Sequence, residues 1–258
     1  MVSGDYEQFK KAVYALTKID LSAYKEKQMR RRIDTLIERN GFKDYPSYAD
    51  GLKKDTKIFD EFINYITINV SEFYRNPDQW ELMDKEFIPE LIKKFGKNLK
   101  IWSAACSTGD EPYSLVMALS KYMPLSQISI FATDLDKQIL AKAQVGLYSD
   151  KSLQGVPEEF KKKYFTKIGQ SYQVHDEIKH CVKFQQHNLL RDPYPKDCQM
   201  IVCRNVLIYF TEEAKDETFK NFYKVLPNNG VLFIGSTEQI TDYREIGYKR
   251  MNSFFYQK

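Results

Sequence analysis

The residues best suited to chemistry lie in one stretch, from Leu99 to Leu115, which reads LKIWSAACSTGDEPYSL. Its alternating apolar start predicts a buried strand, and the small residues at 103–109 predict a turn. The acids and the proline at 110–112 predict that a helix begins there. A strand that passes through a small-residue turn into a helix lets the backbone approach a nucleotide-like ligand beyond the carboxyl end of the strand. The stretch therefore predicts a ligand site in an α/β fold.

The kind of ligand is narrowed by the motifs that this turn lacks. Its only glycine is Gly109, so it is not a G-x-G-x-x-G dinucleotide fingerprint, and no Lys-Ser or Lys-Thr follows as in a P-loop. Two acids flank it instead: Glu111 in the predicted helix and Asp134 at the end of the next predicted strand, 128–133. An acid at that strand end is placed to bind ribose hydroxyls. Singly, Gly109 could simply make the turn and the acids could cap helices. Together they favour an adenosine with a positive centre and no phosphates, which describes S-adenosylmethionine.

The composition is that of an ordinary globular protein. Of the 258 residues, 43% are hydrophobic and 29% are charged. There is no signal-peptide pattern and no apolar run long enough to span a bilayer. The four cysteines lack C-x-x-C spacing, so we expect free thiols and a cytoplasmic protein. The three histidines are too spread to predict a metal site, and without sustained heptads we expect a monomer.

Residues 1–67 predict a small all-α domain with one basic face. The helix expected over 23–39 carries an apolar stripe, and its remaining surface is basic: Lys25, Lys27, Arg30, Arg31, Arg32 and Arg39. Such a charge run is usually a solvated helix surface. It could instead dock an acidic partner, either nucleic acid or an acidic helix, because arginine prefers carboxylate and phosphate partners. The net charge of +4 permits an acidic partner without demanding nucleic acid.

Residues 68–258 predict a second, α/β domain. Segment 68–80 contains NVSEFYR at 69–75, whose arginine either pairs locally or reaches into a cleft at the domain junction. Residues 150–182 are polar and lysine-rich and predict a small β-rich insertion. The remaining strands are expected at 182–187, 200–203, 231–234 and 253–257. Strands that alternate with helices predict a mostly parallel sheet.

With these motifs the chain resembles the CheR family of chemotaxis-receptor glutamate O-methyltransferases. Five segments carry the resemblance, in the family's order and spacing: 69–75 (NVSEFYR), 104–114 (AACSTGDEPYS), 132–134 (ATD), 188–190 (NLL) and 203–210 (CRNVLIYF). The resemblance implies an all-α N-terminal domain before a Rossmann-like class I methyltransferase domain. It implies S-adenosylmethionine as methyl donor, S-adenosylhomocysteine as product and no metal.

The resemblance also implies roles for individual residues. The positions expected to bind the cofactor are Asn69, Ser71, Arg75, Glu111, Asp134, Asn188, Leu189, Arg204 and Asn205. Arg75 and Tyr209 are expected near the transferring methyl group. Lys27, Arg30, Arg31 and Arg32 are expected to dock the cytoplasmic methylation helices of the receptors. Ser71 and Asp110 stand where many members have threonine and glutamate, and both keep the chemistry.

The chemistry agrees with this resemblance. A glutamate carboxylate has a pKa of about 4.3 and is already ionised at neutral pH, so methyl transfer to it needs positioning rather than a general base. Two alternatives stay open: a nucleic-acid methyltransferase, and a non-catalytic adaptor that binds S-adenosylmethionine. The absence of the Asn/Asp-Pro-Pro-Tyr motif counts against the first, and the presence of Arg75 and Tyr209 counts against the second.

Overall fold

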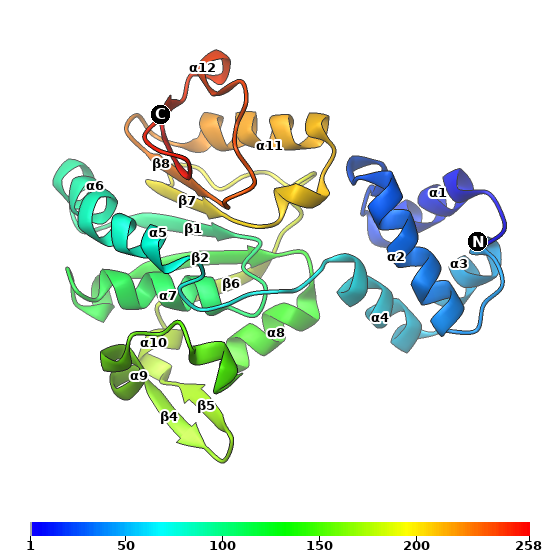
Figure 1. The fold of residues 1–258 in the computed structure, drawn as a ribbon, viewed down its shortest axis with the longest axis horizontal. Coiled ribbons are helices and arrows are strands. Elements are labelled where there is room, and N and C mark those ends of the chain that lie inside the picture. Colours follow the sequence, from blue (N-terminus) through cyan, green and yellow to red (C-terminus); the bar gives the residue numbers. More distant parts are fainter. Residues whose placement is uncertain (1) are drawn as a thin grey trace. The chain divides into compact units, whose positions relative to one another are not determined.

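The computed structural model describes residues 2–258, and these form two compact units (Figure 1). The first contains the chain up to Asn69 together with Ile208–Thr218. The second contains Val70–Leu207 and Phe219–Lys258. The predicted fold class, an all-α part followed by a Rossmann-like α/β part, is confirmed.

The first unit is a helical bundle whose helices begin at aspartate caps. Its main helices are α1 (Tyr6–Thr17), α2 (Glu26–Arg39), α3 (Tyr45–Lys54) and α4 (Thr56–Ile66). Asp5, Asp44 and Asp55 each accept a backbone N–H in the first turn of α1, α3 or α4. Before α2, the carboxylate of Asp20 caps a separate 3₁₀ turn, Leu21–Ala23, so α2 begins three residues later than the sequence predicts.

The second unit is built on a seven-stranded sheet in the order β6-β2-β1-β7-β8-β10-β9. Its strands are β1 (Lys100–Ala104), β2 (Ser129–Asp134), β6 (Val182–Gln186), β7 (Met200–Cys203), β8 (Val231–Ile234), β9 (Lys249–Arg250) and β10 (Phe255–Gln257). The first five strands in the order pair in parallel, and β10 is antiparallel to both neighbours. The mostly parallel sheet is therefore as predicted, although β9 is not among the predicted strands.

The helices of this unit are α5 (Pro77–Leu82), α6 (Ile88–Phe95), α7 (Asp110–Leu119), α8 (Lys137–Val145), α11 (Glu212–Val225) and α12 (Tyr243–Ile246). A π-helical turn, Met83–Phe87, separates α5 from α6. The first residues of α11, through Thr218, belong to the first unit. None of the helices in residues 2–258 is both long enough and apolar enough to cross a membrane.

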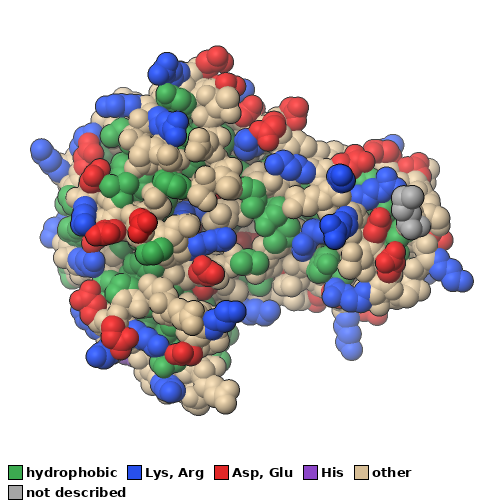
Figure 2. Space-filling model, in the orientation of Figure 1, with side chains coloured by type: hydrophobic (Ala, Val, Ile, Leu, Met, Phe, Trp, Pro, Cys, Tyr) green, Lys and Arg blue, Asp and Glu red, His purple; other side chains and the backbone are tan. Residues whose placement is uncertain are grey.

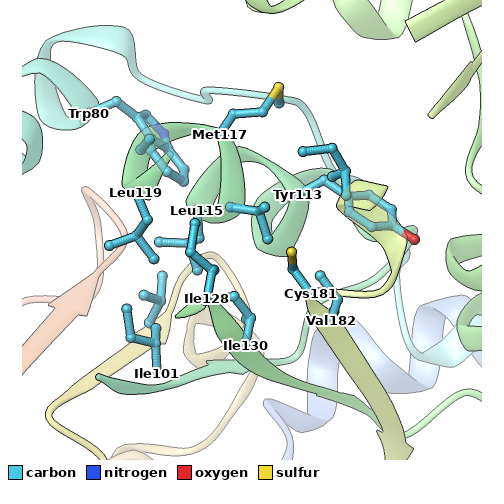
Figure 3. Packing of buried hydrophobic residues seen from close by; sticks show 14 of the residues in the cluster. Trp80, Ile101, Tyr113, Leu115, Met117, Leu119, Ile128, Ile130, Cys181 and Val182 are labelled. Carbon is cyan, nitrogen blue, oxygen red and sulfur yellow. The ribbon is translucent and has the colours of Figure 1, made fainter. Parts of the chain in front are cut away.

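The core of the second unit fixes α7 against the sheet. Every residue of α7 except Glu111 is buried, and Figure 3 shows Leu115 of α7 beside Ile101 and Ile130 of β1 and β2. On the other sheet face Trp102 packs edge-on against Phe222 of α11, with ring centroids 5.5 Å apart. Full burial of such side chains contributes about 1.5–3 kcal/mol each, so the start of α7 is held firmly at the sheet edge.

The insertion forms a small sheet of its own. Strands β3 (Leu147–Ser149), β5 (Ser171–Val174) and β4 (Phe165–Ile168) pair antiparallel in the order β3-β5-β4. The short helices α9 (Glu158–Tyr164) and α10 (Asp176–Lys179) accompany them, and Figure 1 shows this group beside α8. The β-rich insertion is as the sequence predicts.

Candidate active site

The turn between β1 and α7 is fastened to the end of β2. Its backbone is left-handed at Ala105, Ser107 and Gly109, with φ values of 65°, 48° and 89°. A Cβ atom at Gly109 would lie 3.0 Å from Cβ of Ala143, so both the backbone angle and the space require glycine there. The backbone N–H of Ser107 donates to Oδ2 of Asp134 over 2.8 Å. The predicted acid at the end of the second strand thus sets the shape of the turn.

Asp134 keeps capacity for further hydrogen bonds. It is 7% exposed, and its Oδ1 accepts the backbone N–H of Asp136 over 3.1 Å. Burial raises the pKa of Asp134 to about 6, against the lowering effect of the backbone N–H groups. Because a carboxylate offers about four acceptor positions, two remain beside those used by Ser107 and Asp136.

A polar cavity lies next to this turn and contains several of the predicted cofactor residues. The space between its walls is about 320 Å³. It is lined by Val70, Ser71, Glu72, Arg75, Ala105, Cys106, Ser107, Glu111, Arg204 and Asn205. Ser71, Arg75, Glu111, Arg204 and Asn205 were predicted from the sequence. Val70, Glu72, Cys106 and Ser107 were not singled out as site residues.

Two buried polar atoms on these walls fit a polar ligand. Among the described residues, neither Oγ of Ser107 nor Nε of Arg204 has a hydrogen-bond partner. A buried polar group without a partner costs free energy, which a ligand that bonds to it restores. The cavity therefore suits a ligand that offers hydrogen-bond acceptors as well as the hydroxyls or positive charge that acids prefer.

A buried ion pair between Glu111 and Arg204 forms one wall. Nη1 of Arg204 lies 3.9 Å from Oε2 of Glu111, with side chains 3% and 12% exposed. The hydroxyl of Ser103 donates to Oε1 of Glu111 over 2.8 Å. Burial raises the pKa of Glu111 to about 7, while Arg204 acts in the opposite direction. Glu111 therefore changes charge near neutral pH, and a cation bound beside it favours the ionised form.

The segment that carries Arg75 is held by its backbone. The carbonyl of Arg75 accepts Nη2 of Arg204 over 2.8 Å and Nε1 of Trp80 over 3.0 Å. The backbone is left-handed at Tyr74 and Asn76, where non-glycine residues are uncommon. These contacts leave the guanidinium of Arg75 on the cavity wall while its main chain is fixed.

Asn188 and Leu189, also predicted to bind the cofactor, follow β6 at the same sheet edge but do not line this cavity. The backbone N–H of His187 donates to the carbonyl of Asp134 over 2.9 Å, which joins the ends of β6 and β2. Oδ1 of Asn188 accepts the backbone N–H of Leu190, and the carbonyl of Leu189 accepts the hydroxyl of Tyr194. Both residues are thus ordered next to Asp134.

Asn69 and Tyr209 belong to the first unit and are described within it. Nδ2 of Asn69 donates to Oγ1 of Thr67 over 3.0 Å. The carbonyl of Tyr209 accepts the backbone N–H of Lys25 over 2.9 Å, and Thr211 donates to Ala23. The chain segment around Tyr209 is therefore attached to the residues that precede α2.

The predicted docking residues on α2 fall into two groups. Lys27 and Arg31 are exposed, and Figure 2 shows Lys and Arg side chains gathered where Figure 1 draws α2. Nε of Arg30 instead donates to the hydroxyl of Tyr45 over 3.1 Å. The guanidinium of Arg32 lies 4.4 Å from the ring centre of Tyr65 and donates to that residue's carbonyl. Arg30 and Arg32 are thus partly occupied within the bundle.

One buried acid was missed by the sequence reasoning. Glu238 follows β8 and is 0% exposed, and its carboxylate accepts the backbone N–H groups of Asn205, Leu207 and Gly235. The only signal in the sequence is an acid shortly after a strand, as at Asp134. Within residues 2–258 no group of three or more His, Cys, Asp or Glu side chains is arranged to hold a metal ion.

Comparison with known proteins gives matches over nearly the whole chain. A family model described as the CheR methyltransferase SAM-binding domain matches residues 69–253, and one described as the CheR methyltransferase all-alpha domain matches residues 4–67. The chain is 41% identical over 254 residues to a chemotaxis protein methyltransferase of Listeria innocua, covering 98% of this chain and 97% of that protein. It is 31% identical over 251 residues to a chemotaxis protein methyltransferase of Borreliella burgdorferi, covering 92% and 89%.

These matches agree with the cavity at the sheet edge and confirm the resemblance seen in the sequence motifs. The chain belongs to the CheR family of S-adenosylmethionine-dependent methyltransferases.

Proposed function

We propose that this protein transfers the methyl group of S-adenosylmethionine to glutamate carboxylates of chemotaxis receptors, giving glutamate methyl esters and S-adenosylhomocysteine. The observation that carries the proposal is the polar cavity beside Asp134, with the Glu111–Arg204 pair on its wall. The name shared by the relatives, chemotaxis protein methyltransferase, supports receptors as the substrates.

In this proposal the nine residues named from the sequence hold the cofactor. Asp134 accepts the ribose hydroxyls, and Glu111 faces positive charge on the methionine part. The unpartnered Oγ of Ser107 and Nε of Arg204 add hydrogen bonds from the same walls. When bound, S-adenosylmethionine supplies a methyl group activated by its attachment to a positively charged sulfur.

The acceptor carboxylate is proposed to approach through a second cavity. This space of about 730 Å³ shares Ser71, Glu72 and Arg75 with the first, and Lys151 and Ser152 of the insertion line its far part. Because the acceptor is already ionised at neutral pH, no residue needs to remove a proton. We propose that Arg75 and Tyr209 orient the acceptor and shape the space around the transferring methyl group.

The test is transfer of labelled methyl from S-adenosylmethionine to receptor-containing membranes, followed by mild base. Label released as methanol is the expected result, since it identifies a carboxyl methyl ester. Base-stable label in protein, or label in added nucleic acid, would contradict the proposal. Cofactor binding without any transfer would instead indicate an adaptor.

Affinity for S-adenosylmethionine is expected to rise between pH 6 and pH 8. Glu111 has a pKa of about 7 in the folded protein without ligand, so raising the pH ionises it and prepares it for a cation. The sign for stability is opposite: a raised carboxyl pKa means that the folded state holds an extra proton, so the free energy of unfolding falls between about pH 4.5 and pH 7. Calorimetric titration across this range checks the affinity. In Glu111→Gln the rise should disappear, and a rise of unchanged size would refute the assignment.

The docking role of α2 is expected to depend on Lys27 and Arg31. Reversing both to glutamate should lower receptor methylation about tenfold, equivalent to about 1.4 kcal/mol of lost attraction. Affinity for S-adenosylmethionine should stay unchanged, and the deficit should shrink at high salt because exposed charges are screened. Initial methylation rates at several receptor concentrations measure the effect.

A matched control reverses Lys93 and Lys97, two exposed lysines of the second unit, with the same change in net charge. Equal losses in both double variants would mean that overall charge, not α2, drives docking. Reversal of Arg30 or Arg32 is a poorer test, because it also removes their contacts with Tyr45 and Tyr65 inside the bundle.

A further inference from the structure

We propose that Glu238 is a positioning residue for the cofactor: its carboxylate holds the loop that places Arg204 and Asn205 on the cavity wall. The inference rests on the proposed cofactor site and concerns a residue outside the set implied by the sequence motifs. It is argued from three features: the hydrogen bonds of Glu238, the shape of the loop it holds, and its place among the charges of the site.

Glu238 joins the loops at the ends of two neighbouring strands. β7 and β8 pair in parallel with Cys203 opposite Ile234, so the segments after them leave the sheet side by side. Oε2 of Glu238 accepts the backbone N–H of Asn205 over 2.7 Å and of Gly235 over 2.8 Å. Oε1 accepts the backbone N–H of Leu207 over 2.6 Å. Both carboxylate oxygens are therefore used to fix the main chain.

The shape of the loop explains why it needs such a partner. Asn205 has a left-handed backbone, with φ of 61°, which directs successive N–H groups toward one point. A Cβ atom at Gly235 would lie 2.5 Å from Oε2 of Glu238 and 2.9 Å from the backbone N of Asn205, so glycine leaves the room for this approach. Without the carboxylate, the converging N–H groups would be buried without partners, and the loop would rearrange.

Arg204 and Asn205 are the residues that such a rearrangement would move. Both line the cofactor cavity, and the Arg204 side chain is 3% exposed. Arg204 pairs with Glu111 and donates to the carbonyl of Arg75 and to Oδ1 of Asn76. A shift of the loop would therefore disturb the wall of the cavity and the backbone of Arg75 together.

Glu238 also contributes to the charge balance around Glu111. The groups that face Glu111 are the guanidinium groups of Arg204 and Arg75, the carboxylate of Glu238 and the hydroxyl of Ser103. The thiols of Cys106 and Cys203 are buried nearby and stay neutral, since burial raises their pKa values well above the usual range. The negative charge of Glu238 raises the pKa of Glu111, so its removal lets Glu111 ionise at lower pH.

The test is calorimetric titration of S-adenosylmethionine into the full chain between pH 6 and pH 8, with Glu238→Gln as the variant. We expect affinity to fall at least tenfold and the pH midpoint of binding to move to lower pH. The control is Tyr248→Phe, which removes a buried hydrogen bond to the carbonyl of Phe219 and is expected to lower the unfolding temperature without moving the midpoint.

A Glu238→Gln protein with wild-type affinity and midpoint, destabilised only as Tyr248→Phe is, would overturn the proposal. If Glu238→Gln does not fold, Glu238→Asp decides. It keeps the charge but is one methylene shorter, so affinity should fall with the midpoint unchanged, and wild-type affinity would refute the positioning role. Since the readout is binding of S-adenosylmethionine alone, failure here is separable from failure of receptor methylation.

Discussion

Replacing Asp134 by alanine is expected to weaken S-adenosylmethionine binding by at least about 100-fold. The carboxylate accepts the backbone N–H groups of Ser107 and Asp136 and is left with acceptor positions for the two ribose hydroxyls. A hydrogen bond to a charged group contributes about 1.5–3 kcal/mol, so losing two costs about 3 kcal/mol or more. The same substitution frees Ser107, whose left-handed backbone depends on this contact, so the turn also loses its shape.

Titration calorimetry with S-adenosylmethionine measures this loss. Asp55→Ala is a suitable control, because it removes a helix-capping carboxylate in the first unit and is expected to reduce stability without changing cofactor affinity. Thermal unfolding of both variants shows whether they are folded during the titration. Unchanged affinity in a folded Asp134→Ala protein would contradict the ribose assignment.

The part of the site that the sequence predicts well is the part built from local pattern. The turn at 103–109, the helix that begins at Asp110 and the acid after β2 lie within continuous stretches, where strand alternation, small residues and helix-start signals can be recognised. Gly109 has the left-handed backbone that the turn interpretation requires. In the same way, alternation of strands and helices predicts the parallel sheet but not β9, which has only two residues and no pattern of its own.

The features that could not be predicted depend on partners distant in the sequence. Glu238 gains its role only because β7 and β8 are neighbours, which brings it to N–H groups 31 and 33 residues away. Helical spacing places Arg30 and Arg31 side by side on a basic surface. Only the folded bundle shows that Tyr45 of α3 holds Arg30 while Arg31 is exposed. A charge run therefore predicts a basic helix, but its free and occupied members are distinguished by tertiary contacts.

Arg75 is the residue whose substitution is expected to reduce methyl transfer most. Its backbone carbonyl is fixed by Arg204 and Trp80, and its side chain lines both the cofactor cavity and the cavity proposed for the acceptor. Orientation of reacting groups accounts for many kcal/mol of catalysis, and loss of one well-placed charged contact costs about 100-fold or more. We expect Arg75→Ala to lower kcat/KM for the receptor by about that factor, and Arg75→Lys to recover only part, because lysine lacks the planar pair of donors.

The two roles open to Arg75 separate in the measurements. If its guanidinium binds the carboxylate of the cofactor, Arg75→Ala weakens S-adenosylmethionine binding and kcat/KM falls with it. If it orients the acceptor glutamate, cofactor affinity stays at the wild-type value while transfer is slow even at saturating cofactor. The backbone contacts favour a rigid main chain in both cases, so thermal unfolding should change little. Wild-type transfer rates in Arg75→Ala would exclude both roles and shift the positioning of the acceptor to Tyr209.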